Sequence, residues 1–510
     1  MTQIEFIQLL NDNFKLTQEK TLKTKLYLAI KKTLAEVDLA PAFKCPSTRF
    51  LSELLGISRD TVEKTYAQFE QEGIFYRIKG KGSFITATVN TSIQSISIPA
   101  VRDRHSQDPE YTASAPDYVL PHNSEKLEAL FFDQNLNFFA DGMPEIRNFP
   151  FKKWFDTEKH ALAQHGLGIF LKDNAAGDAL LCHEIAQFLN LNRHTQVTAD
   201  QVLIVNSTQQ ALYLCAQVLF NPHDKVIMEN PYYSNAYHLF NLVGLDLYCT
   251  ALDEQGLDIQ RCADLEDIKA IYVTPASQYP SGIQMTTARK QQIIQYAQAQ
   301  GSYIIEDDYD ALMLNSAKNT AIMGLDGFQR TIYLGSFSKY ILPSLRISYM
   351  VLPKALVEPF KRYRNYIDGS APSQYFQVIL ARFMQTGDYA KYLKHMQQLY
   401  AQRYQTFMAC FDLYLADYFY LKEHHPCMQI ACYFKAHIPQ RLEHALVQGG
   451  EIRQMWITRL SQFYAYDAEY GVVLGFSALN QTEIKACMLV LRQLIESELS
   501  RCISDYTTEL

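Results

Sequence analysis

The strongest constraint on the fold is a series of short apolar runs that alternate with helical segments after residue 200. The runs are QVLIVNS (201–207), DKVIMEN (224–230), AIYVTPA (270–276), SYIIEDD (302–308) and TIYLGSF (331–337). Between them, residues 208–220 and 287–300 have the apolar spacing of helices. Strands that are apolar on both faces and separated by helices form a parallel sheet with helices on both sides. We therefore predict an α/β domain.

The chain has 510 residues, which is too long for one ordinary domain. We expect a small N-terminal domain in residues 1–87 and a linker in residues 88–124, which are rich in Ser, Pro and charge. We expect the large α/β domain in residues 125–385. Residues 386–510 contain a long helix, some strands and a C-terminal helix, and we expect them to form a smaller lobe.

Composition excludes several classes of protein. The net charge of −7 gives no general attraction to nucleic acid, so any DNA binding must come from a local basic surface. No apolar stretch reaches the ~18–20 residues of a membrane helix, and the N-terminus lacks a signal pattern. The ten cysteines include no CxxC pair and are expected to be reduced thiols of a cytoplasmic protein. No metal site is expected.

Residues 1–87 contain the pattern of a winged helix-turn-helix. Helices are expected at 22–37, 48–55 and 58–72, followed by two strands within 74–87 around a Gly-Lys-Gly turn. This arrangement places the last helix in a major groove and the turn near the phosphate backbone. Residues 44–84 hold seven Lys/Arg and five Asp/Glu, a local basic excess. The candidate DNA-binding residues are Arg49, Ser58, Arg59, Thr61, Lys79, Lys81 and Gly82.

A second group of polar residues follows two of the predicted strands. Strand 302–308 ends in three carboxylates, and strand 331–337 leads to Lys339. Ligands of parallel α/β sheets bind at the carboxyl ends of strands. A lysine there can form a Schiff base with a carbonyl ligand, and nearby hydroxyls, an arginine and a helix N-terminus suit a phosphate. Considered alone, the carboxylates could equally hold Mg²⁺.

The combination resembles a known family. The string PS-x-R-x-L-x-x-x-L-G-x-S-R-x-T-V with a G-x-G-S-F wing resembles the GntR family of bacterial regulators. The motifs FADGMPEIRNFPFKKW (139–154), STQQALYL (207–214), ENPYYSN (229–235), TPASQYPSG (274–282), IIEDDYD (304–310) and YLGSFSKYILPSLRISY (333–349) resemble fold-type I aminotransferases, which bind pyridoxal 5'-phosphate (PLP). The whole chain most closely resembles the MocR-type regulators, which join these two domains.

The resemblance implies roles for individual residues. Lys339 would form the Schiff base, Asp307 would face the pyridine nitrogen and Tyr233 would stack on the ring. Tyr309 would lie near the ring hydroxyl, and Gln278 and Tyr279 occupy a stretch that also contacts this hydroxyl. The residues expected around the phosphate are Ser207, Thr208, Gln209, Ser336, Ser338 and Arg346. The family also implies a homodimer.

Three positions depart from the aminotransferase pattern. Val473 stands where an arginine usually grips the substrate carboxylate, Lys172 replaces a tyrosine and Ser277 replaces a common histidine. We therefore expect a transcription regulator that binds double-stranded DNA and senses an amine, amino acid or vitamer, with no efficient turnover. The alternatives are an active aminotransferase with an accessory DNA-binding domain, and a regulator whose C-terminal domain has lost PLP.

Overall fold

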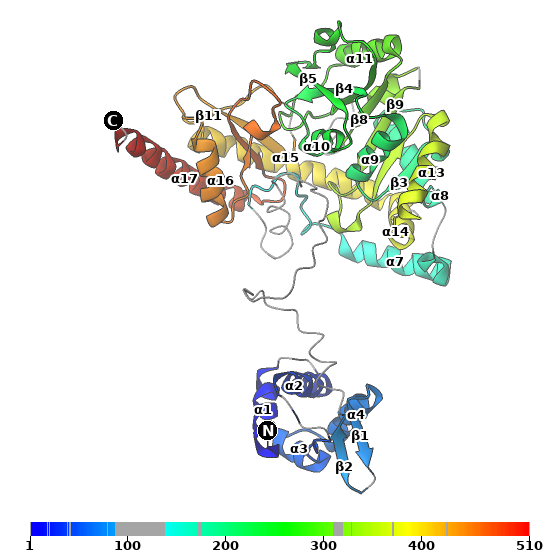
Figure 1. The fold of residues 1–510 in the computed structure, drawn as a ribbon, viewed down its shortest axis with the longest axis vertical. Coiled ribbons are helices and arrows are strands. Elements are labelled where there is room, and N and C mark those ends of the chain that lie inside the picture. Colours follow the sequence, from blue (N-terminus) through cyan, green and yellow to red (C-terminus); the bar gives the residue numbers. More distant parts are fainter. Residues whose placement is uncertain are drawn as a thin grey trace, which may run out of the picture. The chain divides into compact units, whose positions relative to one another are not determined.

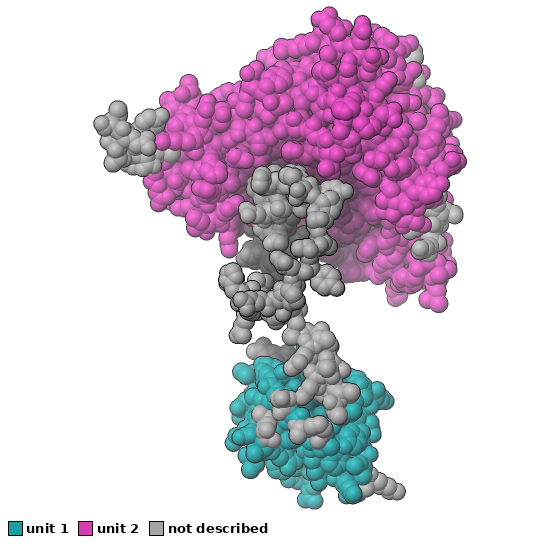
Figure 2. Space-filling view, viewed as in Figure 1, with its two compact units in different colours: residues 1–121 teal, residues 122–510 magenta. Residues whose placement is uncertain are grey.

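The structure, a computed structural model, describes most of the chain. The described residues are 2–86 and 138–508, except 18, 20, 38, 40, 41, 79, 172–175, 310–319, 328, 370, 371, 425 and 426. The chain divides into two compact units, residues 1–121 and residues 122–510 (Figure 2). The predicted linker, residues 88–124, lies outside the described residues. None of the described helices is long and apolar enough to cross a membrane.

The first unit consists of helices and one antiparallel hairpin. Its elements are α1 (Gln3–Leu16), α2 (Leu22–Glu36), α3 (Thr48–Leu55), α4 (Arg59–Gln71), β1 (Phe75–Ile78) and β2 (Gly82–Ile85). The last five agree with the predicted elements to within a residue or two. Helix α1 was not predicted, although Thr2 and Glu5 form a capping box at its start. Leu26, Leu51, Val62 and Phe69 from three helices share one buried core.

The second unit is built around an eight-stranded mixed sheet (Figure 1). The strands are β3 (Val202–Val205), β4 (Lys225–Asn230), β5 (Asp246–Asp253), β6 (Gly256–Leu257), β7 (Ile268–Val273), β8 (Tyr303–Asp307), β9 (Thr331–Ser336) and β10 (Ser348–Val351). Their order is β3-β10-β9-β8-β7-β4-β5-β6. Strands β5, β4, β7, β8 and β9 are parallel neighbours, and β10 runs antiparallel between β9 and β3. The predicted mixed, mostly parallel sheet is confirmed.

Alternate strand residues are buried on opposite faces of this sheet, because successive side chains of a strand point in opposite directions. Leu203 belongs to the core on one face, together with α9 (Thr208–Leu219), α10 (Ser234–Leu242) and α13 (Val357–Asp368). Its neighbour Ile204 belongs to the core on the other face. The helices on that face are α7 (Phe151–His165), α8 (Ala179–Asn192), α11 (Thr287–Gln300), α12 (Ile322–Leu325) and α14 (Gln374–Gln385).

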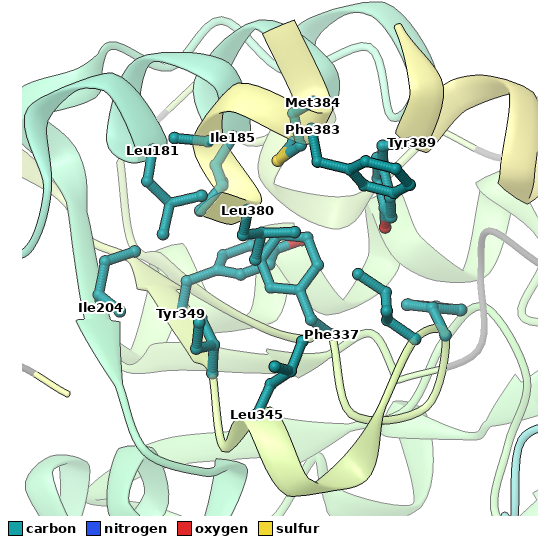
Figure 3. Packing of buried hydrophobic residues seen from close by; sticks show 14 of the residues in the cluster. Leu181, Ile185, Ile204, Phe337, Leu345, Tyr349, Leu380, Phe383, Met384 and Tyr389 are labelled. Atoms are coloured by element: carbon teal, nitrogen blue, oxygen red, sulfur yellow. The ribbon is translucent and has the colours of Figure 1, made fainter. Parts of the chain in front are cut away.

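The core on this second face fixes the loop that follows β9. Phe337 and Leu345 lie in it on either side of Lys339, 3% and 5% exposed, and pack with Tyr349 and Leu380 (Figure 3). Burying two large apolar side chains in one short loop stabilises its conformation by ~1.5–3 kcal/mol each. The loop that carries Lys339 is therefore held at both ends.

The smaller lobe has its own antiparallel sheet. It contains α15 (Asp388–Tyr414), β11 (Phe419–Tyr420), β12 (Gln429–Phe434), α16 (Leu442–Ile452), β13 (Thr458–Arg459), β14 (Gly471–Gly475) and α17 (Gln481–Thr508), with strand order β11-β12-β14-β13. Short 3₁₀ helices η2 (Gly166–Phe170), η3 (Ala199–Gln201), η4 (Ile259–Cys262), η6 (Pro343–Leu345), η7 (Lys354–Leu356) and η8 (Ser461–Phe463) complete the unit.

Candidate functional site

A cavity of about 350 Å³ lies at the carboxyl ends of β8 and β9. The residues predicted to surround a cofactor line it, except Gln278, namely Ser207, Thr208, Gln209, Tyr233, Tyr279, Asp307, Tyr309, Ser336, Ser338, Lys339 and Arg346. Five further lining residues were not singled out from the sequence, namely Asp141, Ser234, Asn235, Ser348 and Phe463. The structure therefore gathers the predicted set at one place and adds residues from distant segments.

The amine of Lys339 lies against a glycine from the start of the second unit. Its Nζ atom donates a hydrogen bond to the carbonyl oxygen of Gly142 at 3.3 Å. A Cβ atom at position 142 would stand 1.8 Å from Nζ, and Gly142 has a φ of +66°, which disfavours other residues. A side chain at position 142 would therefore strain the backbone and displace the Lys339 amine.

One end of the cavity is suited to an anion. Ser207 caps α9 by accepting a hydrogen bond from the amide of Gln210 at 3.2 Å, and Thr208 and Gln209 form the first helical turn. First-turn amides have no partner within a helix and attract anions. Arg346 lines the same cavity, together with Ser336, Ser338 and Ser348. These hydroxyl, amide and guanidinium donors match the acceptor oxygens of a phosphate.

A single carboxyl group stands on β8 within the cavity. Asp307 is 3% exposed and accepts a hydrogen bond from the Tyr272 hydroxyl at 2.8 Å. Burial raises the pKa of Asp307 to about 7, despite this hydrogen bond. A cationic N–H group placed beside Asp307 would offset the cost of burying the ionised carboxylate. The site thus offers a partner for a protonated ring nitrogen.

The carboxylates on either side of Asp307 point away from the cavity. Glu306 accepts hydrogen bonds from the amides of Ile322 and Met323 at 2.8 and 2.9 Å, and Asp308 pairs with buried Arg193 at 2.7 Å. The period of two in a strand separates them from Asp307. The three carboxylates therefore do not converge as a magnesium site would require.

Three tyrosines contribute to the cavity walls. The rings of Tyr233 and Tyr279 meet edge to face at 5.4 Å, and the Tyr309 hydroxyl accepts a hydrogen bond from Gln429 of the small lobe at 3.1 Å. Gln278 is instead buried, and its amide donates to the carbonyl oxygens of Pro231 and Tyr279. Only Tyr279 of the predicted Gln278–Tyr279 pair lines the cavity.

Residues 138–149 bring Asp141 and Gly142 to the cavity and are held by the small lobe. The carbonyl oxygen of Phe139 accepts a hydrogen bond from the amide of Gly475 at 2.9 Å. Buried Glu145 pairs with Arg403 of α15 at 2.6 Å and with Arg147 at 2.7 Å. Asp141 was not among the predicted site residues; it accepts a hydrogen bond from the hydroxyl of Tyr279, which is far away in the sequence.

Val473, which stands where aminotransferases usually have an arginine, lies in an apolar environment. Its side chain is fully buried on β14 in an apolar cluster with Ala431, Tyr433, Leu460 and Phe463. Tyr279 belongs to the same cluster, which therefore adjoins the cavity. Lys172 lies outside the described residues.

The candidate DNA-binding residues lie on α3, α4 and the hairpin of the first unit. Arg49, Arg59 and Lys81 are exposed, and Arg49 forms an exposed pair with Glu53 at 3.2 Å. Ser58 caps α4 by accepting from the amide of Thr61 at 3.1 Å. Gly82 starts β2 with a φ of +116°. Lys79 lies outside the described residues.

Comparisons with known proteins agree with this architecture. Residues 140–425 match the family model "Aminotransferase class I and II". The chain is 28% identical to the "Probable rhizopine catabolism regulatory protein MocR" of Rhizobium meliloti, over 92% of each chain. It is 26% identical to the "Uncharacterized HTH-type transcriptional regulator YdeL" of Bacillus subtilis, over 92% of this chain and 96% of that protein. The chain is also similar to a solved structure of Pyrococcus horikoshii kynurenine aminotransferase, with a TM-score of 0.67 and 21% identity. The match covers 74% of this chain and 94% of that one.

The chain therefore belongs to the aminotransferase class I and II family, and its second unit has the fold-type I aminotransferase fold predicted from the sequence. Over 92% of its length the chain is similar to the helix-turn-helix regulators MocR and YdeL. The predicted resemblance to MocR-type regulators is confirmed.

Proposed function

We propose that this protein is a PLP-binding transcription regulator whose aminotransferase-like unit senses a small amine-containing effector and alters DNA binding by the winged helix. The observation that carries the proposal is the cavity at β8 and β9, which collects the residues expected around PLP, except Gln278. The similarity to helix-turn-helix regulators along nearly the whole chain supports the DNA-binding half.

The residues of the cavity fit several groups of PLP. Arg346, the serines and the α9 N-terminus would hold the phosphate, and Asp307 would pair with the protonated ring nitrogen. Tyr233 would pack on the ring and Tyr309 would lie near its hydroxyl. Lys339 would attach the cofactor covalently, which requires its neutral amine. When bound, PLP supplies an electrophilic carbon that captures amines.

In the first unit, Arg59, Ser58 and Thr61 at the start of α4 would contact base edges and phosphates. Arg49, Lys79, Lys81 and Gly82 would contact the phosphate backbone.

We further propose a homodimer, because exposed apolar side chains of α7 and η2 form a surface that a second copy would cover. Such a protein would act in the cytoplasm.

An active aminotransferase is the second candidate. The residues expected to hold PLP, including Lys339, fit an enzyme as well as a regulator. Val473 favours the regulator, because an apolar side chain cannot grip the substrate carboxylate.

The deciding experiment combines cofactor and DNA measurements on the full chain. Purified protein is loaded with PLP, and its affinity for its own promoter DNA is measured with and without a panel of amines, amino acids and vitamers. We expect one covalently attached PLP per chain, lost in Lys339→Ala, and a change in DNA affinity with one class of ligand. Protein that binds DNA but never PLP would leave only the scaffold alternative, whereas sustained turnover would favour the enzyme.

A further inference from the structure

The cofactor would occupy the positively charged side chains that line the cavity, which leaves none of them for a second ligand. Among the described residues, the charged side chains of the lining are Asp141, Asp307, Lys339 and Arg346. Under the proposed function, Lys339 attaches the cofactor and Arg346 holds its phosphate. No other lysine or arginine of the described chain lines the cavity, so a ligand carboxylate would find no cation there.

The wall contributed by the small lobe is also unsuited to a carboxylate. Val473, Leu460 and Phe463 are all buried in the apolar cluster that includes Tyr279. An ionised carboxylate transferred to an apolar wall loses its hydration without gaining a partner, which is strongly unfavourable.

Asp141 offers the opposite charge and has an unused acceptor. Its Oδ2 atom accepts a hydrogen bond from the hydroxyl of Tyr279, while its Oδ1 atom is buried and has no hydrogen-bond partner. A buried oxygen without a donor is costly, and native structures usually satisfy such groups. The carboxylate therefore presents a negative acceptor that a donor from a ligand would satisfy.

Asp141 lies next in the chain to the residue that contacts the Lys339 amine. The next residue, Gly142, accepts the hydrogen bond from Lys339 Nζ at 3.3 Å. The segment is fixed by the buried pair between Glu145 and Arg403, so Asp141 cannot easily swing away. A small ligand whose amine lies near Lys339 can therefore place its other end near Asp141.

We propose that Asp141 selects the effector and that the effector is a small diamine without a carboxylate. One amine group would lie at the Lys339 end of the cavity, and the second, as an ammonium ion, would pair with Oδ1 of Asp141. This inference rests on the proposed PLP-binding function and specifies its ligand class. Asp141 repels a carboxylate at the same place, so it selects both for cations and against amino acids.

The test uses the full-length protein loaded with PLP and isothermal titration calorimetry. The ligands are the diaminoalkanes with three to five carbons, each compared with the monoamine and the amino acid of the same chain length. We expect at least one diamine to bind tenfold or more tightly than its matched monoamine and amino acid. Asp141→Asn should remove this preference. Asp412→Asn, on an exposed face of α15, makes the same charge change and should leave the preference intact.

Several results would overturn the inference. Tighter binding of an amino acid than of its matched diamine, equal binding of diamine and monoamine, or no binding of any diamine would each reject it. Because these comparisons use the unsubstituted protein, they remain decisive even if Asp141→Asn fails to fold. Failure of the broader proposal is distinguished by separate measurements, namely whether PLP attaches at Lys339 and whether the loaded protein binds DNA.

Discussion

The Lys339 amine and the Gly142 carbonyl oxygen are 3.3 Å apart, and the amine occupies the space that a Cβ atom at position 142 would need. The lysine comes from the loop after β9 and the glycine from the segment held by the small lobe. The reactive amine is therefore positioned by both lobes.

The first prediction concerns this amine. Lys339→Ala should abolish covalent attachment of PLP, while the fold and basal DNA binding remain, because the loop is anchored by Phe337 and Leu345. Gly142→Ala should reduce attachment by displacing the amine, since its Cβ would come within 1.8 Å of Nζ. Borohydride reduction followed by mass spectrometry checks both. A stoichiometric pyridoxyl adduct in Lys339→Ala would refute the assignment.

The second prediction concerns DNA. Arg49→Ala or Lys81→Ala should weaken binding evenly across sequences and reduce the salt dependence by about one unit of slope, as for the loss of one phosphate contact. Arg59→Ala should cost ~1–3 kcal/mol on the specific site if it reads a base in a bidentate manner. Fluorescence anisotropy on specific and scrambled duplexes measures these effects, with Lys485→Ala on α17 as the control. Unchanged affinity in all three variants would exclude this face.

The third prediction concerns pH. Burial raises the pKa of Asp307 to about 7 in the folded protein, whereas an unfolded aspartate titrates near ~4. The folded state then binds the proton more tightly, so Asp307 lowers the free energy of unfolding as pH rises from about 4 to 7. Without cofactor, Asp307→Asn should lack this contribution and gain stability relative to the parent across that window, while binding PLP more weakly. Urea unfolding at several pH values tests this, and parallel curves for parent and variant would contradict it.

The fourth prediction is poor transamination. Val473 cannot replace a charge-assisted arginine–carboxylate pair, whose loss costs ~1.5–3 kcal/mol, or about tenfold to a hundredfold in rate. Common α-amino acids should therefore perturb the cofactor absorbance weakly, with turnover far below ~1 s⁻¹, the low end for enzymes. Multiple turnovers with an amino donor and a keto acid, absent in Lys339→Ala, would show instead that the protein is an enzyme.

The fifth prediction concerns assembly. Phe155, Leu167 and Phe170 on α7 and η2 are 59%, 82% and 60% exposed, a large apolar surface for a monomer. The double substitution Phe155→Glu and Leu167→Glu should convert the expected dimer to a monomer in sedimentation velocity. Ile452→Glu, at an equally exposed position on α16, should remain dimeric. A monomeric parent protein at micromolar concentration would reject the dimer.

The sequence was sufficient to predict features that depend on local patterns. Strand ends placed Asp307 and Lys339 at one sheet edge, because parallel strands share a direction. The period of two could have separated Glu306 and Asp308 from Asp307, although their partners, Arg193 and the α12 amides, could not be foreseen.

Other features depend on contacts between distant segments, which local patterns do not encode. The pairing of Asp141 with Tyr279 and the approach of Phe463 require the small lobe to be placed on the large one. The inward orientation of Gln278 follows from its buried partners, including Glu229. Helix α1 was not predicted, although the capping box formed by Thr2 and Glu5 is a local signal for the start of a helix.

The anchoring of residues 138–149 has a consequence for communication along the chain. The segment that touches the lysine amine through Gly142 is also where the polypeptide arriving from the DNA-binding unit first meets the described part of the second unit. Asp141 lies three residues after Phe138. Under the proposed function, a ligand bound at Asp141 would contact the described part of the second unit that is nearest in sequence to the winged helix.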